Sequence, residues 1–548
     1  MTLNRGKLLK CGLALLCVAL ALSGCGGRSG GGQAVIMLTP APTAVPAATF
    51  APNSGQVTVL DGGKSLAIGY VDTRGVSIHP LRTSSRDVTG LARLVFESVV
   101  DLDENRRPVA QLCDRWEYNQ DDDVWYFTLR AGIKFQDGTP LTAWDVVASY
   151  EDILLNMETS AYYDRVKYLT TVEAMDEQTV RVKCERYGYM TLYAMTFPIV
   201  SRYSIESEYP VGTGPFAYID YNAWGLLRLE VNALWWKQPP AFSVIECKRY
   251  NDTSDALEAI ATGEIQMIAT RSNTAALSRQ LSDRVTMDYA TLTWECLIPD
   301  TRSSILSDVK VRRALMYAID RSSLAGTVYH GLVQESEVPV APGSWLYETQ
   351  SAVYNYSPER ALQMLYDAGW YDTNNDGILD RVKDGLWEDL SIDIVTYNDP
   401  HSNNRTKAAE LIANQLSVIG IRVNVVTSSR SGVLKTINSD EGFEMALVGY
   451  NLSTIPDLNY LLDSRGSGNC SRYANEKLDD LLTQARICNS PTDLRLIMGD
   501  IQLMVVEELP VMGLFFRSGT LISKIGIGGL SGIREDYPYR GIEYVQAD

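Results

Sequence analysis

The three histidines of this 548-residue chain, His79, His330 and His401, are the first candidates for chemistry. None has a His, Cys or Asp neighbour at metal-ligand spacing, and no H-E-x-x-H motif is present. No G-x-S-x-G elbow between a strand and a helix accompanies them, so a serine nucleophile has no local support. We therefore expect a protein that binds rather than catalyses, without a cofactor.

The segment Gly62-Gly63-Lys64-Ser65 matches the Gly-Lys-Ser ending of a phosphate-binding loop. The motif requires a first glycine where this chain has Thr58, so the match fails. We interpret the segment as a surface turn that precedes a strand.

A calcium loop is a weak candidate at Asp372, Asn374, Asp376 and Asp380, with Gly377 at the turn. These residues fit the first nine positions of a twelve-residue calcium loop. The twelfth position, where a bidentate glutamate belongs, is Lys383. Asp, Asn and Gly are also the common residues of tight turns, and we expect no metal site elsewhere.

The N-terminus has the three parts of an export signal. Arg5, Lys7 and Lys10 precede an apolar run over 11–22, which is too short to span a bilayer. The ending Leu22-Ser23-Gly24-Cys25 resembles the bacterial lipobox, in which cleavage precedes the cysteine and the thiol carries a diacylglycerol. We expect a signal peptide over 1–24, lipidation at Cys25 and a flexible Gly-, Pro-, Ala- and Thr-rich tether over 25–56.

Composition restricts the partners. Removal of residues 1–24 takes away three of the 49 basic residues and none of the 67 acidic ones, leaving a net charge of −21. This charge argues against nucleic acid as a partner and against electrostatic attachment to an anionic membrane.

The remaining cysteines could pair as disulfides or act as small buried apolar residues, and we favour free thiols. They are Cys113, Cys184, Cys247, Cys296, Cys470 and Cys488.

Local signals predict an α/β protein. Residues 125–130 alternate in polarity as a half-buried strand does, and Thr142 with Asp145 predicts a capped helix. Another helix is expected from Asp308, with Val311, Ala314, Leu315 and Ala318 on its buried face.

A third helix is expected from Ser357-Pro358 to a stop at Gly369. Strands near 391–397 and 421–427 around a helix at 405–418 predict a β-α-β unit.

Seven segments, in sequence order, resemble the extracytoplasmic solute-binding proteins of family 5, which serve ABC importers of peptides, nickel chelates and some glycans. The longest match reads PVAQLCDRWEYNQDDDVWYFTLRAGIKFQDGTPLTAWDVVAS and covers Pro108–Ser149. The others are VGTGPF (211–216), ALEAIATGEIQMI (256–268), DVKVRRALMYAIDR (308–321), YSPERALQMLYDAGW (356–370), FEMALVGY (443–450) and ELPVMGLFF (508–516).

The resemblance implies two lobes joined by a hinge that close around a ligand. The first lobe would comprise 57–254 and 506–548, with an extra subdomain at about 86–200, and the second would comprise 255–505. The implied partners are a small solute, expected to be an oligopeptide, and an ABC permease with its ATPase subunits. We expect a monomer on the outer face of the cytoplasmic membrane, held by lipid at Cys25. A ligand-sensing lipoprotein on the same fold is an alternative that the sequence leaves open.

The resemblance also implies two edges that bind a peptide as an added strand. One edge falls at Thr83, Ser84, Ser85 and Arg86, and the other at Tyr450, Asn451 and Leu452. Trp294 falls where the family places an aromatic residue, which can stack on ligand or pack in the core. We expect Trp345 and Trp370 to be packing residues.

This sequence departs from the family just after the second edge. Peptide-binding members carry an aspartate there, which anchors the free ammonium of the peptide. The segment 451–456 holds no acid, and Asp457 is the nearest substitute. Loss of that charge-assisted hydrogen bond favours a blocked peptide, a glycan or a metal chelate as the alternative solute.

Overall fold

The computed structural model describes residues 64–72, 77–222, 225–279, 281–400, 402–524 and 530–545, which fall in one compact unit. The predictions for the signal peptide, Cys25, the tether and His401 lie outside these residues.

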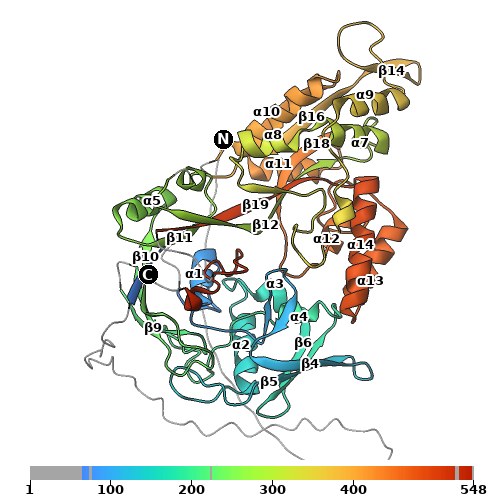
Figure 1. The fold of residues 1–548 in the computed structure, drawn as a ribbon. Helices are drawn as coiled ribbons and strands as arrows, with labels where there is room; N and C mark the ends of the chain where they lie inside the picture. The colour runs from blue at the N-terminus through green and yellow to red at the C-terminus, as the bar shows by residue number, and fades with distance from the viewer. Residues whose placement is uncertain are drawn as a thin grey trace, which may run out of the picture. The chain divides into compact units, whose positions relative to one another are not determined.

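Two long neighbouring strands form the middle of the largest sheet: β12 (Val285–Pro299) and β19 (Met512–Ser523) run antiparallel. The strand order is β17-β16-β18-β12-β19-β11-β1-β10-β9-β8, and β13 also pairs with β19 (Figure 1). The other strands are β1 (Lys64–Val71), β8 (Phe216–Tyr221), β9 (Leu226–Val231), β10 (Phe242–Tyr250), β11 (Met267–Thr270), β13 (Val333–Glu335), β16 (Ser391–Tyr397), β17 (Arg422–Ser428) and β18 (Met445–Asn451).

The two central strands connect two groups of elements. β19 pairs with β11 through its C-terminal half, and β12 pairs with β18 through its C-terminal half. The pairing of β12 with β19 shifts register between Ala290 and Trp294, so the ladder is interrupted between the two groups.

One group contains β1, which runs parallel to β10 and to β11. Helix α5 (Thr253–Thr262) packs on β1 and β11, and α6 (Ala275–Ser278) lies near β19. Residues 255–270 therefore pair and pack with β1, a strand of the predicted first lobe, although the predicted boundary places them in the second. The lobe boundaries remain a prediction.

The other group confirms the local predictions for 308–428. Helix α7 (Val309–Ala318) begins after Asp308, and α9 (Pro358–Asp367) begins after Ser357 and stops before Gly369, whose φ is 86°. Strands β16 and β17 are parallel on either side of α10 (Asn404–Ser417) in the sequence, which is the predicted β-α-β unit. The remaining helices here are α8 (Arg321–Thr327) and α11 (Arg430–Ile437).

A four-stranded antiparallel sheet, β4-β5-β7-β6, lies within the segment predicted as an extra subdomain. The side chains of β5 (Val124–Leu129) alternate in burial as predicted, and the capping box of Thr142 and Asp145 begins α2 (Ala143–Leu155). The other elements are α1 (Arg86–Ala92), β2 (Val100–Leu102), β3 (Pro108–Ala110), β4 (Cys113–Asn119), α3 (Tyr163–Val166), β6 (Leu169–Ala174), β7 (Thr179–Cys184) and α4 (Thr191–Ala194).

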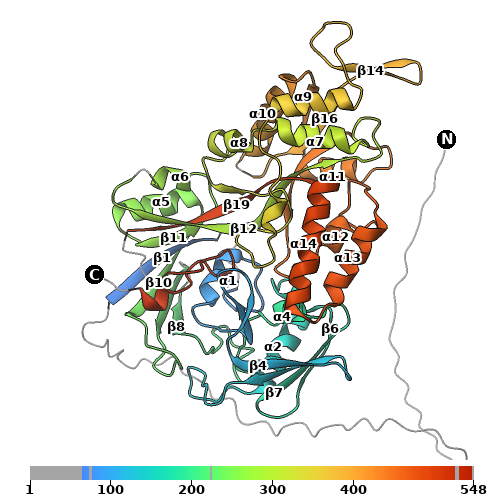
Figure 2. The same ribbon diagram turned by 45° about the vertical axis from the view of Figure 1, so that its right-hand side comes forward.

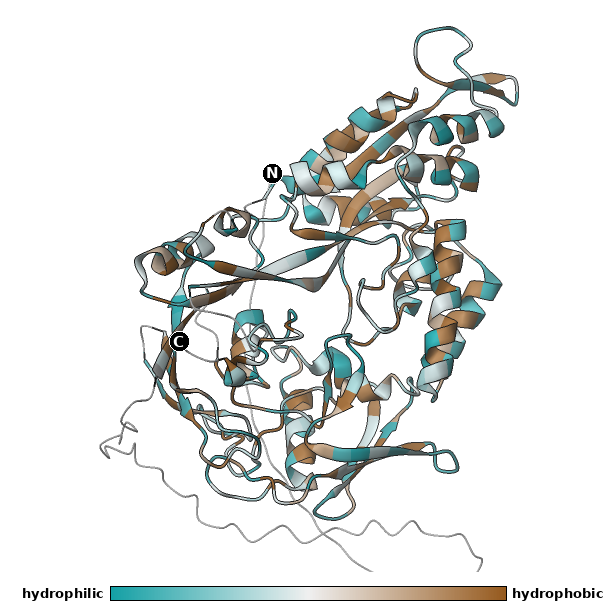
Figure 3. Cartoon of the chain, in the orientation of Figure 1, coloured by the Kyte–Doolittle hydropathy of each residue, from teal (hydrophilic) through white to brown (hydrophobic). Residues whose placement is uncertain are grey.

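Helices α12 (Asn459–Leu462), α13 (Glu476–Ile487) and α14 (Pro491–Glu508) form a further layer (Figure 2). Hydrophobic and hydrophilic residues alternate along α13 and α14 (Figure 3), and the buried side of α13 carries Leu478, Leu482 and Ala485. A two-stranded hairpin, β14 (Asp380–Lys383) with β15 (Leu386–Asp389), and two short 3₁₀ helices, η1 (Thr349–Ser351) and η2 (Ile542–Tyr544), complete the elements.

The mixed α/β architecture confirms the predicted fold class. The six cysteines from Cys113 to Cys488 are free thiols, as expected. No helix among the described residues is long and apolar enough to cross a bilayer.

Candidate solute-binding site

The first predicted edge lies just before α1. Ser85 is the N-cap of this helix, and its hydroxyl accepts a hydrogen bond from the Val88 amide. Thr83 is buried, and its carbonyl accepts a hydrogen bond from the Ala161 amide at 3.0 Å. Ser84, Ser85 and Arg86 line a cavity, whereas Thr83 does not.

This cavity has a volume of about 440 Å³ and lies at the C-terminal ends of β1 and β11. Ligands commonly bind at that end of parallel strands, because the loops that follow diverge there. Its lining is rich in hydroxyl groups, from Ser84, Ser85, Thr253, Thr270, Ser272, Tyr289 and Tyr539. The cavity is therefore suited to a polar solute.

Glu535 is the central charge of the cavity. Its Oε1 accepts from Arg86 Nη1 at 2.9 Å and from Arg271 Nη1 at 2.8 Å. Burial alone would raise the pKa of Glu535, but Arg271 and Arg86 outweigh that effect and hold its pKa below the usual range. Burial raises the pKa of the adjacent Asp87, and Arg271 offsets only part of the rise.

The second predicted edge closes β18. The Tyr450 hydroxyl donates to the Gly468 carbonyl at 3.1 Å, and burial raises the pKa of Tyr450. The Asn451 side chain accepts from Thr293 Oγ1 at 2.9 Å. Leu452 lines a separate small cavity of about 50 Å³, so the two predicted edges line different cavities.

Leu292 connects the two edges, in the part of β12 where the ladder with β19 is interrupted. Its amide donates to Glu535 Oε2 at 2.9 Å, and its carbonyl accepts from the Leu452 amide at 2.9 Å. A short path of hydrogen bonds thus runs from Arg86 through Glu535 and Leu292 to Leu452. Sequence reasoning missed both Glu535 and Leu292, because each acts from a distant part of the chain.

Asp457, the predicted substitute for the anchoring acid, lies in the small cavity with its carboxylate engaged. It accepts from Arg186 at 3.2 Å, from Arg486 at 3.0 Å and from the Tyr187 hydroxyl at 3.1 Å. Burial would raise the pKa of Asp457, but Arg486 and the hydrogen bonds from Asn459 outweigh it and lower the pKa. In this arrangement its charge is balanced by protein cations.

Residues 107–471 match the family model described as bacterial extracellular solute-binding proteins, family 5. The chain belongs to this family.

The family assignment agrees with the curated relatives. The chain is 25% identical over 454 residues to the oligopeptide-binding protein AppA of Bacillus subtilis, a match that covers 78% of this chain and 82% of the relative. It is also 25% identical over 456 residues to heme-binding protein A of Haemophilus influenzae, covering 76% and 80%. Among solved structures, HbpA2 from Haemophilus parasuis superposes with a TM-score of 0.75 at 20% identity, covering 87% of this chain and 99% of that one, which supports the shared fold.

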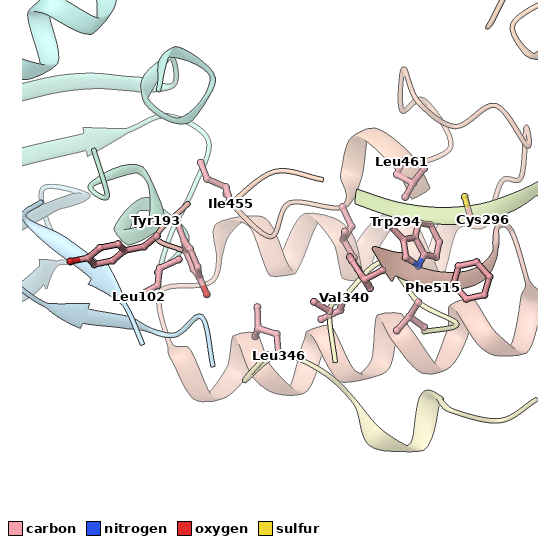
Figure 4. Packing of buried hydrophobic residues seen from close by; sticks show 14 of the residues in the cluster. Leu102, Tyr193, Trp294, Cys296, Val340, Leu346, Ile455, Leu461 and Phe515 are labelled. Atoms are coloured by element: carbon pink, nitrogen blue, oxygen red, sulfur yellow. The ribbon is translucent and has the colours of Figure 1, made fainter. Parts of the chain in front are cut away.

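Trp294 of this family 5 protein is fully buried in the sheet core. Its indole Nε1 donates to the Ser336 carbonyl at 3.4 Å, and its ring lies 6.4 Å from that of Phe516. Figure 4 shows it in the same cluster as Cys296 and Phe515. The indole therefore has no exposed face for a solute in this arrangement.

The two tryptophans that we expected to be packing residues, Trp345 and Trp370, also have packing contacts. Trp370 is fully buried, and Trp345 Nε1 donates to the Tyr193 hydroxyl at 2.8 Å.

The calcium-loop segment forms a compact turn. The Asp372 carboxylate accepts from the amides of Asp376 and Gly377, both at 3.1 Å. The buried Asp380 carboxylate accepts from the Thr373 amide and hydroxyl. No group of three His, Cys, Asp or Glu side chains arranged to hold a metal occurs in the part of the chain that the structure describes.

Proposed function

We propose that this family 5 protein captures a peptide-like solute in the cavity beside Ser84, Ser85 and Arg86 and delivers it to an ABC permease. The observation that carries the proposal is the polar cavity of about 440 Å³ at the first predicted edge, with paired charges at Arg86, Arg271 and Glu535. Such groups can exchange their contacts with each other for contacts with a zwitterionic solute. We infer a binding role rather than a catalytic one.

Calorimetry with the full chain tests this function. The protein is unfolded and refolded first to remove retained solute, and then titrated with di- to nonapeptides. A peptide should bind and raise the melting temperature, because a ligand that binds only the folded state stabilises it. Absence of binding by every peptide in the series would refute a peptide solute.

A blocked peptide, a glycan or a metal chelate is the second candidate class. It is favoured by the two arginines that already balance Asp457, since a free ammonium would have to compete with them. N-acetylated peptides, chitotetraose, heme and nickel–histidine in the same titration separate these alternatives. A ligand-sensing role on the same fold would give tight binding but no solute uptake by cells that carry the permease.

We also infer a lipid anchor at Cys25, which would keep a monomeric binding protein beside its permease. Metabolic labelling with palmitate should mark the wild-type chain and leave Cys25→Ser unlabelled. Light scattering on the delipidated protein should give the mass of one chain. Equal labelling of Cys25→Ser and the wild type would contradict the anchor.

A further inference from the structure

A groove of about 720 Å³ shares no lining residue with the solute cavity. Four aromatic side chains line it: Trp116 and Tyr118 of β4, Trp125 of β5, and Tyr189 before α4. Trp125 and Tyr189 are buried, whereas Trp116 and Tyr118 are partly exposed. The groove thus has a buried aromatic floor and accessible aromatic sides.

Three of these aromatic rings, those of Tyr118, Trp125 and Tyr189, form a connected row. Tyr118 lies opposite Trp125 in the β4–β5 ladder, with ring centroids 5.2 Å apart. Trp125 meets Tyr189 edge-on at 6.3 Å. This packing holds the rings in fixed orientations, as a stacking surface requires.

The opposite wall, with Asn489 and Pro491, is held against this row by backbone hydrogen bonds. The Tyr189 amide donates to the Cys488 carbonyl at 2.6 Å, and the Gly188 amide donates to the Arg486 carbonyl at 2.9 Å. The approach is close enough that a Cβ at Gly188 would lie 2.4 Å from the Cys488 oxygen. The ion pairs of Asp457 with Arg186 and Arg486 reinforce the same junction.

Two polar atoms of the groove residues have no partner. Trp125 is 5% exposed, and its Nε1 donor makes no hydrogen bond. The Asn489 Oδ1 acceptor is also buried and makes no hydrogen bond. Unpaired buried polar atoms are rare and unfavourable. Both atoms belong to residues that line the groove, so a ligand with an acceptor and a donor group can satisfy them.

The charged residues of the groove are already engaged. Arg107 stacks over the Trp345 ring at 5.4 Å, and the Asp103 carboxylate accepts from the amides of Asn105 and Arg107. Asp103 and Arg107 also carry opposite charges, so the lining residues of the groove have no net charge and favour a neutral ligand over an ion.

We propose that this groove is a second binding site, for a neutral saccharide chain. Sugar rings present flat C–H faces that stack on Trp116 and Tyr118, and their hydroxyls can accept from Trp125 and donate to Asn489. A proline-rich peptide would also stack on aromatic rings, but proline has no N–H to donate to Asn489. The site does not depend on the solute cavity.

Calorimetry and tryptophan fluorescence with chitotetraose, cellotetraose and maltotetraose test the proposal on the full chain, with decaproline as the competing ligand class. At least one tetrasaccharide should bind with a dissociation constant below about 1 mM. Trp116→Ala should weaken it at least roughly tenfold, since it removes a stacking face. Trp125→Phe should weaken it as well, while retaining the melting temperature because the ring still packs.

Trp144→Ala is the matched control, because this 45% exposed tryptophan of α2 lies outside the groove. Arg86→Gln, at the solute cavity, should leave saccharide affinity unchanged. The proposal is overturned if no tetrasaccharide binds at 10 mM, roughly ten times the expected constant. Binding of decaproline alone, or equal saccharide binding by wild type and both groove variants, also overturns it.

Discussion

Glu295 and Arg405 form a two-pronged ion pair in the centre of the protein, with both N–O distances at 2.9 Å. Neither side chain is more than 2% exposed. Arg517 also contacts Glu295 at 2.6 Å, and Asp399 contacts both arginines. The network links β12, β19 and α10 beside the interruption in the central ladder.

Glu295→Gln should lower the free energy of unfolding by about 3–5 kcal/mol, the usual effect of removing one partner of a buried ion pair. The glutamine would leave Arg405 and Arg517 with Asp399 as their remaining carboxylate partner. Urea denaturation measures the change. Glu173→Gln is the control, because its partner Arg181 forms a partly exposed pair worth less than about 1 kcal/mol. Equal losses in the two variants would contradict the prediction.

The same network predicts a pH dependence. Burial would raise the pKa of Glu295, but Arg517 and Arg405 outweigh it and bring the pKa below its ordinary 4.5. The folded state therefore binds this proton less readily than the unfolded state does. Its contribution to stability should be complete above pH 4.5 and decrease as the pH falls toward the folded pKa.

Melting curves at descending pH should show a smaller acid-induced loss for Glu295→Gln than for the wild type. A loss of equal size in both proteins would mean that Glu295 does not contribute to acid sensitivity.

The sequence predicted the elements that depend on local signals. Ser357-Pro358 and Gly369 delimit a helix because capping and turn preferences act within a few residues. The network of Glu295 was not predicted, since Arg405 is 110 positions away and no local pattern links them. Glu295 lies within the apolar C-terminal part of β12, and a buried acid of this kind requires a partner such as a buried cation.

Only part of the candidate site could be proposed from the sequence, for the same reason, and its role in binding stays a prediction. Motif order located segments 83–86 and 450–452, but the structure alone reveals that Glu535 and Leu292 join them. Whether Trp294 stacks on ligand or packs in the core depended on side-chain direction relative to β19, which a single sequence does not specify.

Arg86→Gln should reduce peptide affinity roughly tenfold while changing stability little. The Arg86 side chain is 48% exposed, and Arg271 remains to pair with Glu535. Calorimetry with the best peptide of the titration series measures the effect. Arg181→Gln, on the antiparallel sheet of β4–β7, is the matched control. Unchanged affinity in Arg86→Gln would exclude the first edge from peptide binding.

Trp294→Phe should lower stability by about 1–3 kcal/mol and leave solute affinity unchanged. The smaller ring leaves space in the core and frees the Ser336 carbonyl from its indole donor. Denaturation and calorimetry on the same preparation separate the two effects. A large loss of affinity without a loss of stability would restore the stacking role for Trp294.

Calcium should not raise the melting temperature at millimolar concentration. Asp380 already accepts two hydrogen bonds from Thr373, and Lys383 occupies the position where a calcium loop needs a bidentate carboxylate. A bound calcium ion would also be repelled by the positive charge of Lys383. A thermal titration with calcium, with magnesium in parallel, measures the effect. A rise of several degrees with calcium, absent in Asp376→Ala, would instead show that Asp372, Asn374 and Asp376 hold the ion without the twelfth ligand.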